Sequence, residues 1–137
     1  MVEVPALALS AARVAPEVDF FSIGTNDLAQ YTMAAERGNA TLGSLLDAAS
    51  RAPVLRLVAA VVEAAEAHGR WVGVCGELAG DPEAAVALVG VGVRELSMAA
   101  GRIPAVKAAL RETDGEAAAA AAQRMLRPVT AAAPDSA

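Results

Sequence analysis

Four short apolar segments are spaced along the chain, with longer segments of helical periodicity between them. The apolar segments are rich in β-branched or aromatic residues and span residues 1–5, 18–25, 71–75 and 93–98. Continuous apolar runs of this length are typical of strands that are buried on both faces of a parallel sheet. The pattern therefore predicts four buried strands.

The intervening segments carry the signals of helices. Residues 53–68 place their apolar side chains three and four positions apart on one face, and Gly69 follows as the expected stop. Asp81 followed by Pro82 predicts an N-cap and a first-turn proline, opening a helix that continues through Val89. Further helices are predicted over residues 10–14 and 103–111, and a C-terminal helix over 113–128.

Strands and helices alternate in this prediction, which is the order of βα units around a parallel sheet. The chain has 137 residues, enough for one compact domain. A closed (β/α)₈ barrel takes about 250 residues, and the first strand begins at Met1, so the chain looks truncated at its N-terminus. Residues 129–137 are expected to form a flexible tail.

Composition and charge narrow the classes of function. Hydrophobic residues make up 55% of the chain and aromatic residues 3%, so the core must be built from small aliphatic side chains. The net charge of -5 argues against nucleic acid as the main ligand. No apolar run is long enough to span a membrane. The single cysteine excludes an internal disulfide, and the acid at Glu3 argues against a secretory signal, so we expect a cytoplasmic protein.

Polar side chains gather where the predicted strands end. Glu3 follows the first strand, Asn26 and Asp27 the second, and Cys75 ends the third. Ligands bind at this edge in parallel α/β folds. Glu3 and Asp27 offer the oxygen ligands that Mg²⁺ prefers, although a solvated terminal acid and a helix N-cap would give the same pattern.

Two further residues could take part in chemistry. Arg37 follows the helix after the second strand and could bind a phosphate through its planar guanidinium, but a solvated loop arginine would look the same. Cys75 could act as an acid or a nucleophile, although a lone cysteine is often inert packing.

Several blocks of sequence resemble a known family. They are MVEVP at the N-terminus, VDFFSIGTNDL from Val18, ERGN from Glu36 and GVCGELAGDP from Gly73. In this order they resemble the phosphoenolpyruvate-utilising enzymes, and most of all enzyme I of the bacterial sugar phosphotransferase system. The resemblance covers about residues 1–112 and implies the C-terminal half of a (β/α)₈ TIM barrel, with about four βα units.

The resemblance also implies an activity. Enzyme I moves the phosphoryl group of phosphoenolpyruvate to a histidine of a separate mobile domain and then to a phosphocarrier protein, with Mg²⁺ or possibly Mn²⁺ as cofactor. Carried over by motif, Glu3 and Asp27 match metal ligands, and Asn26, Asp27 and Arg37 match substrate-binding residues. Cys75 matches the catalytic acid that protonates enolpyruvate.

The first half of the family's barrel and its phosphohistidine domain have no counterpart in this chain. We therefore expect the chain to be inactive alone, with the missing barrel half supplied by another chain or replaced by self-association. A non-catalytic oligomeric binding module and a truncated gene remnant are alternatives, as is a fragment of a pyruvate phosphate dikinase or a phosphoenolpyruvate synthase.

Overall fold

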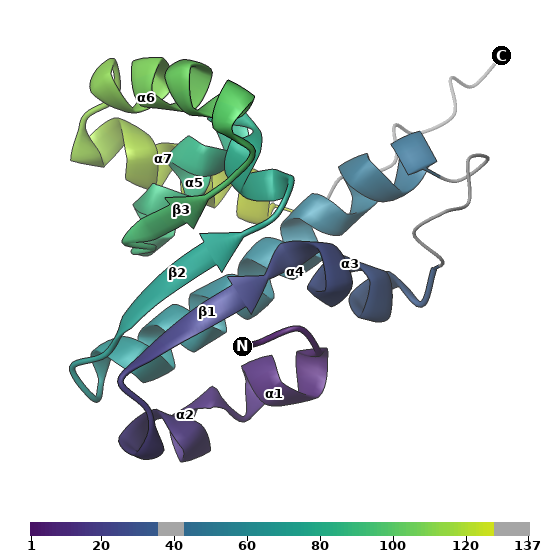
Figure 1. Cartoon of the computed structure of the whole chain (residues 1–137), viewed down its shortest axis with the longest axis vertical. Helices are drawn as coiled ribbons and strands as arrows, with labels where there is room; N and C mark the ends of the chain where they lie inside the picture. The colour runs from purple at the N-terminus through teal and green to yellow at the C-terminus, as the bar shows by residue number, and fades with distance from the viewer. Residues whose placement is uncertain (36–42, 128–137) are drawn as a thin grey trace, which may run out of the picture.

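The centre of the molecule is a parallel sheet whose strands lie in chain order. The computed structural model describes the backbone of residues 1–35 and 43–127, and the side chains of residues 1–35 and 50–127. In this part of the chain the sheet has the order β1-β2-β3, with β1 at Phe20–Gly24, β2 at Trp71–Cys75 and β3 at Glu95–Ser97 (Figure 1). Gly24 pairs with Cys75, and Cys75 pairs with Ser97. The register therefore brings the carboxyl ends of all three strands to one edge.

The strand predicted over residues 1–5 is wrong. Only Val2 joins the sheet, through an isolated parallel bridge to Ile23, and a helix, α1 (Pro5–Leu9), begins almost at once. The Val2 N–H donates to the Ser22 carbonyl at 2.7 Å, and Val2 is buried. The physical reason is Pro5, whose fixed φ suits the first position of a helix and ends the extended segment.

The other helices follow the sequence signals, with shifted ends. The helix predicted over 53–68 is α4 (Gly43–Glu66), which begins ten residues earlier and carries Pro53 inside it. The predicted end near Gly69 is confirmed, since Gly69 has φ +65°. The helix predicted over 103–111 is found at those residues. The remaining helices are α2 (Ala11–Val14), α3 (Thr25–Met33), α5 (Pro82–Val91), α6 (Ile103–Arg111) and α7 (Gly115–Leu126), with 3₁₀ turns η1 (Ala15–Glu17), η2 (Leu78–Gly80) and η3 (Ala100–Arg102).

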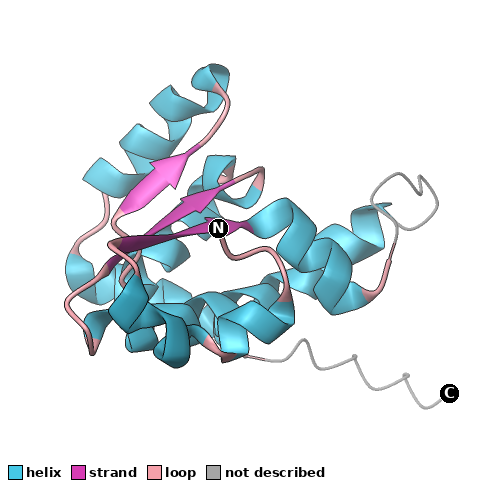
Figure 2. Cartoon of the chain, turned by 60° about the horizontal axis from the view of Figure 1, so that its bottom comes forward, coloured by secondary structure: helices cyan, strands magenta, loops and turns pink. Residues whose placement is uncertain are grey.

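The core lies on one face of the sheet. Alternate strand residues, among them Phe21, Ile23 and Val74, are buried and belong to the same hydrophobic core as residues of α4 and α5. Figure 2 shows the strands side by side with helices packed beneath them. On α4 most of the positions that the periodicity predicts are buried, but Leu57 is only half-buried and Leu55, outside the predicted set, is fully buried. Gly90 of α5 lies against the backbone of Ala118 of α7, which allows these helices to pack closely. The core residues of these two helices include Val54, Leu55, Val58, Val61, Val62, Ala65, Val86, Ala87 and Leu88.

The opposite face of the sheet carries a mixture of aromatic and polar side chains. Phe20 and Trp71 stack with ring centroids 4.5 Å apart, and they are 48% and 37% exposed. Gly73 lies beside them, and Glu95 and Ser97 of β3 are exposed. The α/β class with a parallel sheet is thus confirmed. In the described part of the chain the architecture comprises three strands and one bridge.

The predicted tail, residues 129–137, lies outside the described residues. None of the helices described is both long and apolar enough to cross a membrane.

Candidate active site

The loops that follow β1, β2 and β3 are tied together at the carboxyl edge of the sheet. Thr25, which is 2% exposed, donates its hydroxyl hydrogen to the Cys75 carbonyl at 3.0 Å. The Gly76 N–H donates to the Ser97 carbonyl at 3.3 Å. These two bonds link the first turn of α3 to the end of β2, and the end of β2 to the end of β3. These hydrogen bonds hold the backbone segments that carry the side chains of the site.

Asn26 is held by the loop after β2. Its Oδ1 accepts the Glu77 N–H at 3.2 Å, which leaves the amide NH₂ group as the donor toward a ligand. Gly76 makes this approach possible, because a Cβ at this position would lie 2.7 Å from Thr25 Oγ1 and 3.0 Å from Asn26 Oδ1. Gly76 also has φ +122°, which side chains rarely tolerate. The glycine of the Cys-Gly-Glu motif thus positions Asn26.

Glu3 reaches the same edge through the Val2 bridge. Its Oε1 lies 2.9 Å from where a Cβ of Gly24 would be, so the carboxylate rests on the backbone at the end of β1. Asp27 lies in the first turn of α3, three residues after Gly24. Mg²⁺ commonly binds one or two carboxylates and completes its shell with water and substrate phosphate, so Glu3 and Asp27 are the residues at this edge that could hold it. Within the described residues no three His, Cys, Asp or Glu side chains gather into a metal cluster.

Cys75 ends β2 between these groups. Its thiol is partly exposed, and Sγ donates to the Ile23 carbonyl at 3.5 Å. Cys75 therefore presents a thiol at this edge, a kind of group that can serve as a general acid. Arg37, the remaining predicted site residue, lies outside the described residues.

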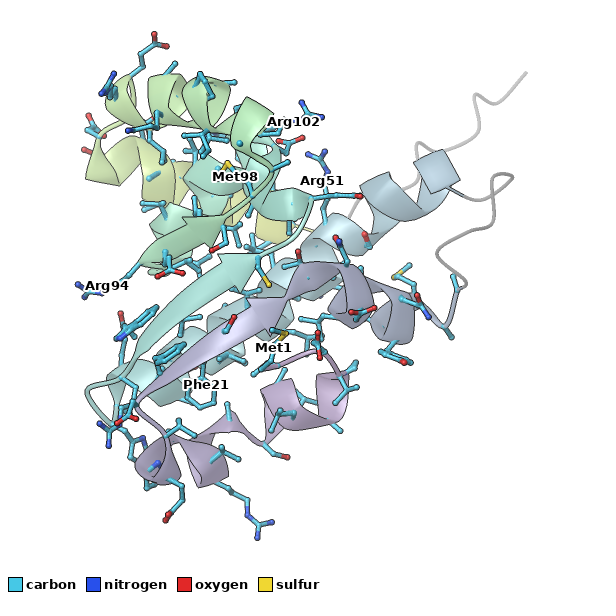
Figure 3. The ribbon with its side chains drawn as sticks, viewed as in Figure 1. Met1, Phe21, Arg51, Arg94, Met98 and Arg102 are labelled. Atoms are coloured by element: carbon cyan, nitrogen blue, oxygen red, sulfur yellow. The ribbon has the colours of Figure 1, made fainter. Side chains whose placement is uncertain are left out.

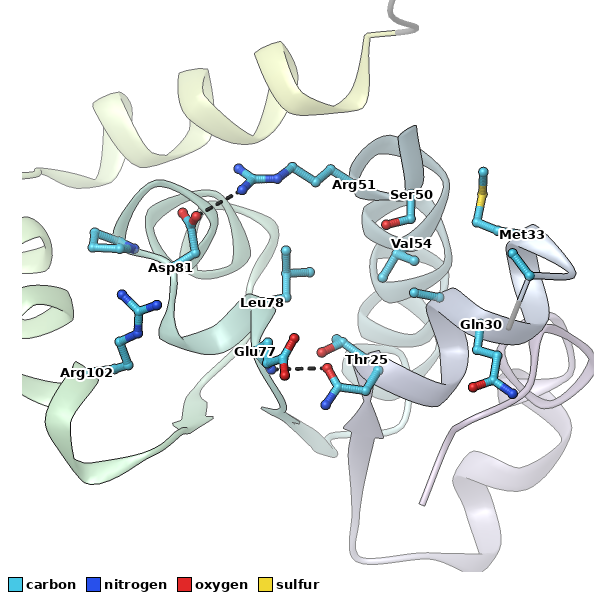
Figure 4. Close-up of a pocket in the computed structure, with 14 residues that line it drawn as sticks. Thr25, Gln30, Met33, Ser50, Arg51, Val54, Glu77, Leu78, Asp81 and Arg102 are labelled. Atoms are coloured by element: carbon cyan, nitrogen blue, oxygen red, sulfur yellow. Dashed lines mark hydrogen bonds and ion pairs between the residues drawn. The ribbon is translucent and has the colours of Figure 1, made fainter. Parts of the chain in front are cut away.

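Two hollows flank this edge, and sequence reasoning missed them. A cavity of about 330 Å³ lies between α3, α4 and η2 (Figure 4). A second, of about 470 Å³, lies between the loops after β2 and β3. Asn26 lines both hollows, whereas Glu3, Asp27 and Cys75 line neither. Arg51 and Arg102, which also line the first cavity, carried no sequence signal because their positions depend on how the helices pack.

Asp81 forms part of the wall of the first cavity. As predicted, it caps α5, accepting the Ala84 N–H at 3.0 Å, and it also pairs with Arg51 at 2.9 Å. Burial raises the pKa of Asp81, but the hydrogen bond from Ala84 and the positive charge of Arg51 together outweigh burial and lower the pKa below its ordinary value. Asp81 is therefore ionised at neutral pH, and it joins α4 to α5.

Comparison with known proteins agrees with this geometry. The family model described as "PEP-utilising enzyme, PEP-binding domain", where PEP is phosphoenolpyruvate, matches residues 1–115. The chain belongs to the PEP-utilising enzyme family. The predicted resemblance is thus confirmed over most of the chain.

Three curated relatives place the chain within that family. A phosphoenolpyruvate-protein phosphotransferase of Haloferax volcanii is 56% identical over 96% of this chain, and one of Haemophilus influenzae is 46% identical over 96%. A multiphosphoryl transfer protein of Xanthomonas campestris is 54% identical over 81%. The aligned region covers 23%, 23% and 13% of these relatives, so the chain spans less than a quarter of their length.

Proposed function

We propose that this chain forms the phosphoenolpyruvate-binding part of a phosphotransferase that moves the phosphoryl group of phosphoenolpyruvate to a protein histidine. The observation that carries the proposal is the convergence of Glu3, Asn26, Asp27 and Cys75 on one sheet edge. This edge offers two carboxylates for a metal, an amide donor for an anion and a thiol. The names of the relatives supply the reaction class.

Each residue has a distinct role in this proposal. Glu3 and Asp27 hold Mg²⁺, which neutralises charge on the phosphoryl oxygens when it is bound. Asn26 donates its NH₂ group to the substrate from an orientation fixed by Glu77. In the reaction, the bond from phosphorus to the enol oxygen breaks and a bond from phosphorus to the histidine nitrogen forms. Cys75 Sγ then gives its proton to the enolate carbon, which becomes the methyl group of pyruvate.

One face of the sheet is partly uncovered in the described part of the chain, which supports the proposal that further structure packs against it. Parallel sheets are almost always covered on both faces, whereas Phe20 and Trp71 are partly exposed here. We propose that four further βα units, from another chain or from a longer chain, cover this face and complete a (β/α)₈ barrel. Arginines on those units and a phosphohistidine domain would complete the reaction, and a phosphocarrier protein would receive the phosphoryl group.

Titration of Mn²⁺ and phosphoenolpyruvate into the purified chain tests the proposed site, with chain mass followed by light scattering. We expect saturable Mn²⁺ binding that tightens when phosphoenolpyruvate is present. Asp27→Ala should lose this binding because it removes one of two carboxylates. Asp114→Ala is a matched control, since Asp114 is also an acid in the N-terminal region of a helix, the distant α7. Equal Mn²⁺ affinity in Asp27→Ala and the parent chain would rule out the metal assignment.

Activity is tested by adding the first barrel half together with the phosphohistidine domain. We expect phosphorylation of the histidine only in the mixture, and Cys75→Ala should still bind phosphoenolpyruvate but release pyruvate more slowly. A stable homodimer that binds no phosphoenolpyruvate and is not rescued by the added half would favour the non-catalytic oligomeric module instead.

A further inference from the structure

The cavity between α3, α4 and η2 has the size of a ligand site but lacks the proposed metal and acid residues. Its volume of about 330 Å³ falls at the lower end of the range for small-molecule pockets. Its lining is about evenly polar and apolar, with Val54 and Leu78 beside Asn26, Gln30 and Ser50. A compact ligand with one polar end fits such a lining.

Two arginines and one carboxylate line the wall of this cavity, and only one of the arginines pairs with the carboxylate. Arg51 of α4 donates to Asp81 at 2.9 Å, and Figure 4 shows Asp81 lying between Arg51 and the guanidinium of Arg102. Asp81 also accepts the Ala84 N–H, so its oxygens are committed to α5 and to Arg51. Among the described residues Arg102 has no ion pair within 4.0 Å, so its charge is available to a ligand.

The stem of Arg102 is fixed by packing. A Cβ on Gly80 would lie 3.2 Å from Arg102 Cγ and 3.4 Å from its Cβ, so the side chain rests directly on the backbone of η2. Figure 3 places Arg51, Arg102 and Met98 at the carboxyl end of the sheet, whereas Arg94 points outward at the other end. Arg102 as a whole is exposed, and the packing of its first two side-chain carbons reduces the entropy that it loses when it binds an oxyanion.

The remaining charge in the lining belongs to Glu77. Its side chain is exposed, as Arg102 is, so solvent screens both its repulsion of an anion and the attraction of Arg102. Its backbone N–H is the group that holds Asn26, and Asn26, Glu77 and Arg102 line both hollows. A ligand bound at Arg102 therefore lies beside the proposed substrate-binding amide without using Glu3, Asp27 or Cys75.

We propose that this cavity is a second anion site, which binds the carboxylate or phosphate group of a small metabolite through Arg102, with Arg51 and Asp81 as a fixed wall. The site uses none of the metal or acid residues of the proposed function, and Asn26 borders both sites. Its ligand is a compact oxyanion whose apolar part contacts Val54 and Leu78.

Amide chemical shifts in the ¹⁵N-labelled chain provide the test, with inorganic phosphate and acetate as separate probes at constant ionic strength and without divalent metal. We expect saturable shifts at Gly80, Met98 and Arg102. Tighter binding of phosphate would indicate a phosphate ester as the natural ligand, and tighter binding of acetate would indicate an organic acid.

Three variants make the test specific. Arg102→Ala should weaken binding about tenfold, because a charge-assisted pair is lost. Glu77→Gln should tighten it about twofold, because a like charge is removed. Arg94→Ala removes an exposed arginine far from the cavity and should leave affinity unchanged.

The proposal is overturned if the parent chain gives no saturable shift at these amides. It is also overturned if Arg102→Ala binds as the parent does, or if Arg94→Ala weakens binding equally. Asp27→Ala separates the two sites: it should lose Mn²⁺ binding but keep the phosphate or acetate shifts. Loss of both in Asp27→Ala would mean that the anion binds at the metal-dependent edge and would refute a second site.

Discussion

Replacing Asp81 by alanine removes two interactions of known geometry at once. The carboxylate caps α5 through the Ala84 N–H and pairs with Arg51 of α4. Loss of a helix N-cap costs about 1 kcal/mol. The ion pair joins side chains that are 33% and 34% exposed, so it contributes about 0.5 kcal/mol. We therefore expect Asp81→Ala to lower the free energy of unfolding by about 1.5 kcal/mol.

Asparagine separates the two contributions, because it caps helices about as well as aspartate but carries no charge. Asp81→Asn should cost only the ion-pair part, about 0.5 kcal/mol, and high salt should reduce that difference. Asp114 provides the matched control: it caps α7 through the Ala117 N–H at 2.8 Å and forms no ion pair within 4.0 Å in the described part of the chain. Asp114→Ala should cost about 1 kcal/mol, and Asp114→Asn almost nothing.

Urea unfolding followed by far-ultraviolet circular dichroism measures these differences. The reasoning is refuted if Asp81→Asn is as damaging as Asp81→Ala, or if Asp81→Ala costs no more than Asp114→Ala. The pH dependence gives a second readout. Because the pKa of Asp81 is lowered in the folded state, its contribution is present above its ordinary value of 3.8 and disappears as pH falls through the folded-state pKa. The gap between the parent and Asp81→Asn should therefore close in acid.

Two glycines give further predictions. Gly24→Ala places a Cβ 2.9 Å from Glu3 Oε1, so the carboxylate must move. The Mn²⁺ affinity, measured by calorimetry, should therefore fall about fivefold. Gly101→Ala is the control, because a Cβ at Gly101 meets open space and should leave the Mn²⁺ affinity unchanged. Gly90→Ala drives a Cβ into the backbone of Ala118 and should separate α5 from α7, costing about 2–3 kcal/mol in urea unfolding. Gly115→Ala, also with open space, should cost nothing, and equal stability of the two helix variants would contradict the close packing.

Local signals in the sequence determined most of the elements. The apolar runs located β1 and β2, the Asp81-Pro82 pair located the start of α5, and periodicity identified the buried face of α4. Such signals act within a few residues, because caps, prolines and helical periodicity are properties of adjacent positions. The same locality explains the error at residues 1–5, where the apolar run predicts a strand although Pro5 begins a helix.

The sequence also identified the polar groups at the strand ends, and the structure brings Glu3, Asn26 and Cys75 to one edge. Their roles in metal binding and proton transfer stay predictions.

Only the tertiary structure decided which distant residues meet. Arg51 and Asp81 are thirty positions apart, and Arg102 reaches the same cavity from the loop after β3. No periodicity relates these three residues, because their separation depends on how α4 and α5 pack on the sheet. Local patterns therefore fix what each segment becomes, whereas the cavity and its unpaired arginine result from packing between segments.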